Sequence, residues 1–146
     1  MPTGDPNNEE AFEVCVMRSD LREARTPKDA ILKRLRECKY DAHAVFAVKL
    51  ALEEAISNAV KHGNRHDQSK RITVRYAVDD DRTVIVVRDE GSGFQPECVP
   101  DCRRPDRLPV PNGRGIMLIR AYMDEVEFRD NGREICCVKY RKAKRR

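Results

Sequence analysis

The sequence predicts an α+β domain, a two-layer sandwich in which helices cover one face of a mixed, mainly antiparallel sheet. Segments with alternating apolar side chains, typical of strands, lie near both ends and in the middle of the chain. Between them lie segments whose apolar residues recur three and four positions apart, as in helices. The expected order is strand, helix, helix, strand, strand, loop, helix, strand, strand. Helices packed on one face of an antiparallel sheet are the simplest arrangement for that order.

The N-terminal part predicts one strand and one amphipathic helix. Residues 12–17 alternate with period two, which indicates a strand. Thr26 is placed to cap a helix, and Pro27 suits a first helical position. The apolar stripe over residues 31–38 extends this helix to about Lys39.

A second helix is predicted after Asp41, a residue type that caps helices. Residues 42–52 are apolar almost all round, so we expect this helix to be buried on more than one face, with His43 as a core or boundary residue. Gly63 is placed to end the helix in the left-handed conformation.

Two adjacent strands and a long loop follow. Residues 71–78 place apolar side chains on one side, and residues 79–82 turn the chain into a second strand over residues 83–88. From residue 95 to 112 the periodicity disappears and five prolines accumulate, which predicts a loop. Loops of this length in a compact domain are usually functional or disordered.

The C-terminal part predicts a helix that starts at Gly115 and covers residues 116–123. Two strands follow, over residues 125–129 and 134–140, around the sequence Asn131-Gly132. Asn-Gly is a strong signal for a β-hairpin.

Composition favours one domain that is not embedded in a membrane. The chain has 146 residues, of which 40% are hydrophobic and 37% charged. It has no apolar run of about eighteen residues, and its N-terminus is polar, so we expect a cytoplasmic protein. We expect a flexible N-terminus over residues 1–8, a domain over residues 9–141 and a solvated basic tail over residues 142–146.

The six cysteines are expected to be reduced thiols, because their spacing is irregular and nothing directs secretion. A zinc site is a weaker interpretation. Cys98 and Cys102 with His62 and His66 have suitable atoms, but their spacing departs from that of zinc fingers, and His66 is expected to lie beyond the helix.

The second helix carries a polar pair at its C-terminal end. Glu54 and Asn58 lie four residues apart, on the same stripe as the small residues Ala47 and Ala51. An unpaired amide costs roughly 1–3 kcal/mol to bury, and a charge costs more. An exposed helix face would explain both residues, and so would a Mg²⁺ ion held by the Asn58 oxygen, with Glu54 as a proton acceptor.

Two glycine-bearing segments add to this pair. Asp89 follows a strand directly and precedes Gly91 and Gly93, which allow close approach of a ligand to the main chain. Residues 113–115, Gly-Arg-Gly, open a helix whose free N–H groups attract anions. Each segment alone is also typical of a turn or a helix cap, but their combination supplies the parts of a magnesium-nucleotide site.

These segments resemble a known family. Residues 54–59, 89–94 and 113–116 resemble the N, G1 and G2 boxes of the GHKL superfamily, the ATPases shared by gyrase, heat-shock chaperone, histidine kinase and mismatch-repair proteins. Residues 113–126 look most like its anti-sigma-factor serine/threonine-protein kinase branch. The resemblance covers residues 12–140, nearly the whole chain.

The resemblance implies a Bergerat-type fold that binds ATP and Mg²⁺. It implies that Glu54 activates the attacking hydroxyl, Asn58 binds Mg²⁺ and Asp89 reads the adenine amine, with residues 95–112 as the ATP lid. The other residues that it places at the nucleotide are Gly91, Gly93, Gly113, Arg114 and Gly115.

The resemblance also implies partners. In this branch the phosphate goes to a serine or threonine of a small anti-anti-sigma antagonist, and the unmodified kinase sequesters a sigma factor. Relatives often dimerise, so a homodimer is implied, whereas direct binding to a membrane or to nucleic acid is not.

The predicted lid departs from some relatives because it contains no Ser or Thr near the phosphates. Arg103, Arg104 and Arg107 are candidates to replace those hydroxyl groups electrostatically. This departure leaves open a first alternative, a non-catalytic nucleotide-binding module that sequesters a regulator. A second alternative is the catalytic half of a histidine kinase. The second is disfavoured because no helix before the ATP site offers a phospho-accepting histidine.

Overall fold

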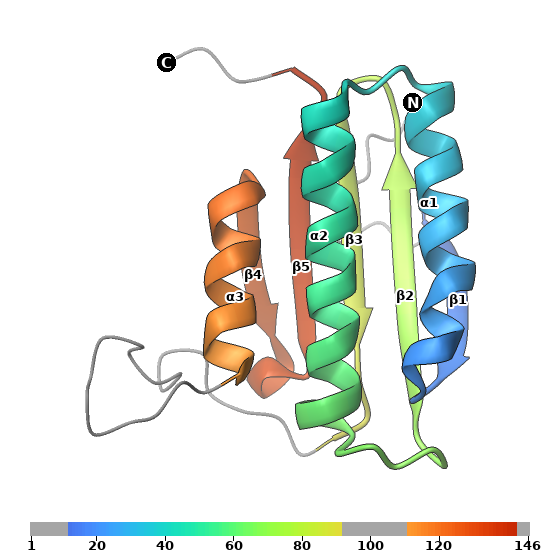
Figure 1. Cartoon of the computed structure of the whole chain (residues 1–146), viewed down its shortest axis with the longest axis vertical. Coiled ribbons are helices and arrows are strands. Elements are labelled where there is room, and N and C mark those ends of the chain that lie inside the picture. The colour runs from blue at the N-terminus through green and yellow to red at the C-terminus, as the bar shows by residue number, and fades with distance from the viewer. Residues whose placement is uncertain (1–11, 92–110, 143–146) are drawn as a thin grey trace.

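The computed structural model describes residues 12–91 and 111–142, which form two layers (Figure 1). One layer is a five-stranded sheet, and the other contains helices that lie side by side across one face of that sheet. The predicted α+β architecture and order of elements are therefore confirmed.

The sheet has the spatial order β1-β2-β3-β5-β4, and every pair of neighbouring strands is antiparallel. The described sheet is thus antiparallel throughout rather than mixed. Its strands are β1 (Glu13–Arg18), β2 (Arg71–Val78), β3 (Arg82–Arg88), β4 (Glu125–Arg129) and β5 (Glu134–Tyr140). Because β5 pairs with β3, the end of β3 at Arg88 lies opposite the start of β5 at Glu134.

The helices are α1 (Arg25–Glu37), α2 (Ala42–Asn58) and α3 (Pro111–Tyr122), with the short helical turns η2 (Leu21–Ala24), η3 (Ala59–Gly63) and η5 (Asp130–Gly132). Asp41 caps α2 as predicted, because its Oδ1 accepts a hydrogen bond from the Ala44 N–H at 2.8 Å. The turn η3 continues α2 directly, with π-helical hydrogen bonding.

The predicted boundaries of α1 are wrong by one or two residues. Thr26 does not cap the helix, because α1 begins at Arg25, straight after η2. Asp20 caps η2 instead, where it accepts the Arg22 N–H at 2.9 Å. At the other end, α1 stops at Glu37, and Lys39 takes a positive φ of 60°.

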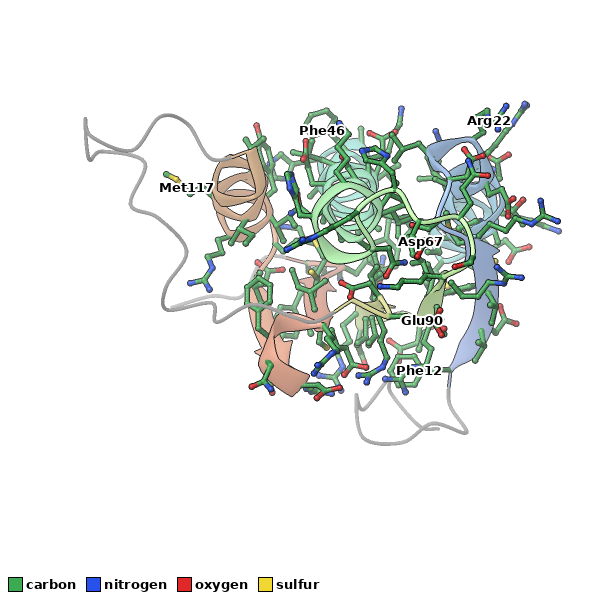
Figure 2. The ribbon with its side chains drawn as sticks, turned by 90° about the horizontal axis from the view of Figure 1, so that it is seen from below. Phe12, Arg22, Phe46, Asp67, Glu90 and Met117 are labelled. Atoms are coloured by element: carbon green, nitrogen blue, oxygen red, sulfur yellow. The ribbon has the colours of Figure 1, made fainter. Side chains whose placement is uncertain are left out.

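The core lies between the sheet and α2, which contacts α1, α3 and the sheet. Ala47, Ala51 and Ala55 are buried along α2, and their small side chains let α3 approach closely. The prediction that α2 is buried on several faces is confirmed, but His43 is exposed rather than packed. Phe46 is also 51% exposed, on the outer face of the helix layer (Figure 2).

The opposite face of the sheet carries a second apolar cluster of Phe12, Val84, Val86, Cys136 and Val138. Figure 2 shows Phe12 on this helix-free side. The predicted strand at residues 12–17 is confirmed, yet Val14 and Val16 on the edge strand β1 are 59% and 60% exposed.

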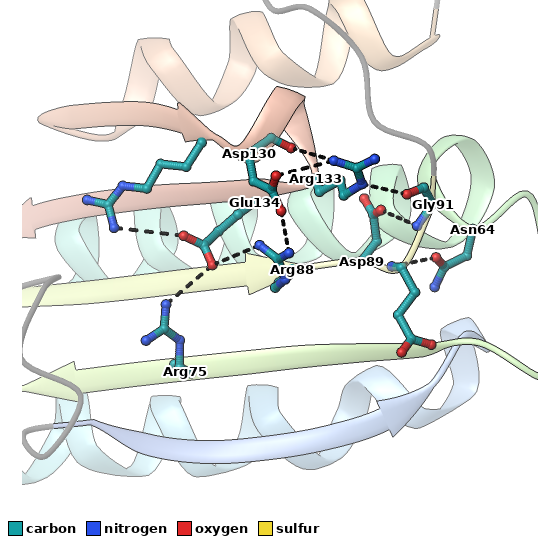
Figure 3. Close-up of polar contacts among 10 residues, drawn as sticks. Asn64, Arg75, Arg88, Asp89, Gly91, Asp130, Arg133 and Glu134 are labelled. Atoms are coloured by element: carbon teal, nitrogen blue, oxygen red, sulfur yellow. Dashed lines mark hydrogen bonds and ion pairs between the residues drawn. The ribbon is translucent and has the colours of Figure 1, made fainter.

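Glu134 on the same face is buried among arginines (Figure 3). Its Oε1 lies 3.3 Å from Arg75 Nη2 and 3.7 Å from Arg88 Nη1. A buried carboxylate needs such partners, so this network fixes the start of β5 next to the end of β3.

The third helix begins earlier than predicted. We expected it at Gly115, but α3 starts at Pro111, so Asn112, Gly113 and Arg114 belong to its first turn. Proline suits a first helical position because the missing N–H has no partner there. The predicted loop therefore ends at residue 110, and its residues 95–110 lie outside the described part.

The C-terminal hairpin has the predicted limits. Its loop has four residues, 130–133, and Asp130, Asn131 and Gly132 take positive φ values of 51°, 55° and 83°, a conformation that Asp, Asn and Gly favour. Within residues 12–91 and 111–142, no helix has the length and apolar character needed to span a membrane.

Candidate functional site

The polar pair of α2 lies against α3. Glu54 and Asn58 are half-buried, one helical turn apart. A Cβ atom built on Gly115 of α3 would lie 2.9 Å from Glu54 Oε2 and 3.3 Å from Asn58 Nδ2. A side chain at position 115 would therefore press on both groups, and the glycine lets α3 approach these two side chains of α2 closely.

Asp89 lies at the end of β3 and is 8% exposed. Its Oδ1 accepts a hydrogen bond from the Gly91 N–H at 2.8 Å (Figure 3). Its own N–H donates to the Arg133 carbonyl at 2.9 Å. Among the described residues, no donor reaches Asp89 Oδ2. One carboxylate oxygen is thus held by the main chain, and the other lies against Gly63.

Gly63 and Gly91 close around this carboxylate. A Cβ atom on Gly63 would lie 2.2 Å from Asp89 Oδ2, and one on Gly91 would lie 1.9 Å from the Gly63 carbonyl oxygen. The end of η3 therefore touches the turn after β3.

The predicted left-handed conformation of Gly63 is wrong. Positive φ values occur two and three residues later, at Arg65 and His66. The position requires glycine because a side chain has no space there.

One cavity of about 80 Å³ joins these elements. It lies between the end of α2 with η3, the end of β3, the start of α3 and the hairpin around η5. Its lining residues are Ala55, Asn58, Ala59, His62, Gly63, Val87, Asp89, Ile116, Phe128, Gly132, Arg133 and Ile135. Asn58 and Asp89, which are 31 positions apart in the chain, thus face one space.

The remaining predicted site residues are placed only in part. Gly113 and Arg114 lie in the first turn of α3, where free N–H groups and the helix dipole attract anions. Gly93 lies outside the described residues.

Burial shifts the pKa values of two residues that line the cavity. Burial raises the pKa of Asp89, and the Gly91 N–H, Arg133 and Arg88 each lower it in part. Burial also lowers the pKa of His62, and the charges of Lys61 and His66 add to that effect. A raised carboxyl pKa is typical of functional sites, although structural networks also produce it.

Two residues of this region were missed from the sequence. Asn64 is 1% exposed; its Oδ1 accepts the Glu90 N–H at 2.8 Å, and its Nδ2 donates to the Arg71 carbonyl at 3.1 Å. Arg133 donates from Nε to the Gly91 carbonyl at 2.8 Å. No local pattern marks either residue, because both contacts depend on elements that meet only in the fold.

Mg²⁺ fits the atoms of the α2 pair. Magnesium prefers oxygen ligands and binds through one or two protein groups together with phosphates and water. Asn58 provides an amide oxygen at the cavity, and Glu54, which lies near Gly115 as Asn58 does, provides carboxylate oxygens one helical turn away. No group of three or more His, Cys, Asp or Glu placed to hold a metal occurs in the described ranges.

The zinc interpretation remains untested because Cys98 and Cys102 lie outside the described residues. Cys15, Cys38, Cys136 and Cys137 are free thiols.

Gly63→Ala should destabilise the protein by about 1–3 kcal/mol, the usual cost of overpacking a tight site. The new methyl group must displace the buried Asp89 carboxylate, which lies within 2.2 Å of its position. The free energy of unfolding in urea measures this effect. Lys61→Ala, at an exposed position of the same turn, is the control and should change stability little; an equal loss in both variants would contradict the steric explanation.

Comparison with known proteins adds evidence from whole sequences. The family described as Histidine kinase-like ATPase domain matches residues 17–139. Serine-protein kinase RsbW of Listeria monocytogenes (serovar 1/2a, strain EGD-e) is 31% identical over 108 residues, which cover 69% of each chain. Serine-protein kinase RsbW of Bacillus subtilis (strain 168) is 32% identical over 64% of this chain and 62% of its own.

A solved structure shares the fold. The chain with the RsbU and RsbW domains of Rv1364c from Mycobacterium tuberculosis superimposes with a TM-score of 0.58 at 20% identity. The match covers 88% of the present chain and 31% of the solved one. The present chain thus spans about two thirds of its curated relatives and about one third of the solved chain. From the family match over residues 17–139 together with these relatives, the chain belongs to the histidine kinase-like ATPase domain family.

Proposed function

We propose that the chain binds ATP with Mg²⁺ and acts as a serine/threonine-protein kinase that also serves as an anti-sigma factor. The observation that carries the proposal is the convergence of Asn58, Asp89 and the start of α3 on one cavity, with Glu54 beside Asn58. The family match and the relatives named serine-protein kinase support it.

In this proposal Asp89 recognises the adenine base of the nucleotide. Its Oδ2 accepts a hydrogen bond from the adenine amino group, and Gly63 and Gly91 let the main chain pack directly against the carboxylate and hold it in place. The first turn of α3, which contains Gly113 and Arg114 and is followed by Gly115, faces the phosphates through its free N–H groups. Gly93 and a lid over residues 95–110, which ends where α3 begins, complete the nucleotide site within a domain that spans residues 9–141.

The reaction end is the α2 pair. Asn58 holds the metal through its amide oxygen, and Glu54 accepts the proton of the serine or threonine hydroxyl that attacks the γ-phosphate. Magnesium, when bound, neutralises developing phosphate charge. Glu54 and Asn58 lie on adjacent turns of one rigid helix, so the fold keeps their spacing constant.

We further propose that the protein is cytoplasmic and that its partners are a sigma factor and an anti-anti-sigma antagonist, which receives the phosphate. Nucleotide binding would then shift the population of states that bind each partner. A homodimer belongs to the proposal as well. Val14 and Val16 support it, because β1 is the end strand of the sheet formed by residues 12–91 and 111–142, and exposed apolar side chains on an edge strand favour association.

The second candidate is a nucleotide-binding switch without phosphoryl transfer. It is favoured by one feature of the sequence, the absence of Ser and Thr from residues 95–112. Such a module would bind ATP or ADP and a regulator, and would leave the antagonist unmodified.

Incubation of the protein with labelled ATP, Mg²⁺ and a cognate antagonist protein separates these candidates. The kinase transfers label to a serine or threonine of the antagonist, whereas the switch module forms a stable nucleotide complex without transfer. Absence of calorimetric binding of both ATP and ADP would refute both candidates. Label found on a histidine of the chain itself would favour the histidine-kinase alternative.

A further inference from the structure

Arg133 holds both ends of the turn that carries Asp89. It lies between η5 and β5, and its Nε donates to the Gly91 carbonyl at 2.8 Å (Figure 3). Its own carbonyl accepts the Asp89 N–H at 2.9 Å. Arg133 also lines the cavity, so one residue of the β4–β5 hairpin is bonded to the turn at residues 89 and 91.

The turn determines how the carboxylate is presented. The Gly91 N–H donates to Asp89 Oδ1 at 2.8 Å, and Oδ2 lies next to Gly63. If Gly91 moves, this N–H no longer holds Oδ1, and the carboxylate is free to rotate. The hydrogen bond from Arg133 to the Gly91 carbonyl opposes that movement.

We propose that Arg133 is a positioning residue for base recognition, which holds the Asp89–Gly91 turn so that Asp89 presents its free oxygen to the amino group of adenine. This inference rests on the proposed nucleotide-binding function. It adds a determinant of base specificity on the C-terminal hairpin, outside the three segments that the sequence indicates.

The charge of Arg133 has a second effect. Burial raises the pKa of Asp89, and among the neighbouring charges Arg133 opposes that rise most, ahead of Arg88 and Lys70. His62 is the other titratable group at the cavity, on η3. An ionised carboxylate accepts the adenine N–H bond more strongly than a protonated carboxyl group, in which one oxygen becomes a donor, so affinity should fall as pH decreases through the pKa of Asp89.

Two substitutions separate the hydrogen bond from the charge. Arg133→Lys keeps the charge but has a carbon where arginine has Nε. Arg133→Gln places an amide nitrogen at that same position in the side chain but removes the charge. Arg141 offers matched controls, because its Nε donates to the Asp80 carbonyl at 2.6 Å, at the other end of β3.

The test is calorimetric binding of ADP and of inosine diphosphate, which lacks the amino group, between about pH 5 and pH 8. We expect Arg133→Lys to weaken ADP about three- to tenfold and inosine diphosphate much less, because only ADP uses Asp89. We expect Arg133→Gln to bind ADP nearly normally at the highest pH, with the midpoint of its pH dependence shifted upward. Comparison with wild type at each pH cancels the titration of His62 and of the phosphates.

The possible results distinguish failure of the positioning role of Arg133 from failure of the proposed nucleotide-binding function. The positioning role alone would be overturned if the wild type binds ADP and both Arg133 variants keep its nucleotide preference and its midpoint for the pH dependence of ADP binding. Equal weakening of both nucleotides in Arg133→Lys would also overturn it, because that result indicates general loosening. Equivalent effects in Arg141→Lys and Arg141→Gln would do the same. No ADP binding by wild type would overturn the proposed function and this inference with it.

Discussion

Asp89→Asn should weaken ATP binding by about 100-fold or more, because the site would present a hydrogen-bond donor to a donor. The Gly91 N–H requires an acceptor at 2.8 Å, so the asparagine must turn its oxygen toward Gly91 and its NH₂ group toward the cavity. That group faces the adenine amine and cannot pair with it. Calorimetric titration with ATP and Mg²⁺ measures the loss.

The same geometry predicts a change of base preference. Inosine triphosphate carries a carbonyl oxygen in place of the amino group, so the NH₂ of Asp89→Asn can donate to it. The variant should bind inosine triphosphate more tightly than it binds ATP. Asp81→Asn, at an exposed position in the β2–β3 turn, should leave both affinities unchanged. An Asp89→Asn variant that binds ATP as tightly as wild type would remove Asp89 from the site.

Asp89→Asn should not lower the stability of the fold, although it weakens ATP binding. Burial raises the pKa of Asp89, so its ionised form is less favourable in the folded state than in the unfolded chain. Its contribution to stability is therefore largest below the unfolded pKa and declines as pH rises through the folded pKa. At neutral pH the uncharged asparagine should leave the unfolding temperature equal to or above that of wild type, which excludes misfolding as the cause of lost binding.

Local sequence signals predicted most of the fold. Residues 71–78, 125–129 and 134–140 have the predicted strand limits, because period-two alternation and the Asn-Gly turn act over neighbouring residues. Asp41 was predicted as a cap for the same reason. Alternation does not say what covers each face, so the exposure of Val14 and Val16 was not foreseen.

The sequence predicted the candidate site residues, but it did not predict the contacts that hold the Asp89 turn in place. The grouping of Glu54, Asn58 and Asp89 followed from combining three weak patterns, and the structure brings their elements to one cavity, while their roles remain predictions. Gly63 was noticed as a helix terminator, but its close contact with Asp89 arises from two elements that meet only in the fold. Arg133 depends in the same way on β5 pairing with β3.

Glu54→Gln should reduce phosphoryl transfer to the antagonist by about 10²–10⁴-fold, the usual contribution of a general base. ATP affinity should change little, because glutamine keeps the size and an oxygen of the side chain next to Asn58. Labelled-phosphate transfer under single-turnover conditions, with binding measured on the same protein, separates the two quantities. A loss of rate at constant affinity is the expected pattern for a residue that acts on the hydroxyl rather than on the nucleotide.

Glu53→Gln is a close control because it changes the adjacent carboxylate of α2. Glu53 is exposed, and its Oε2 lies 3.4 Å from Nζ of Lys28 on α1. Its replacement therefore removes a surface ion pair of about 0–1 kcal/mol and leaves the cavity intact. Its transfer rate should match that of wild type. Equal rates in wild type and Glu54→Gln would exclude Glu54 as the base, and transfer would then depend on the orientation of the hydroxyl by Asn58 and the phosphates. Loss of transfer in Glu53→Gln would instead indicate that the outer face of α2 binds the antagonist.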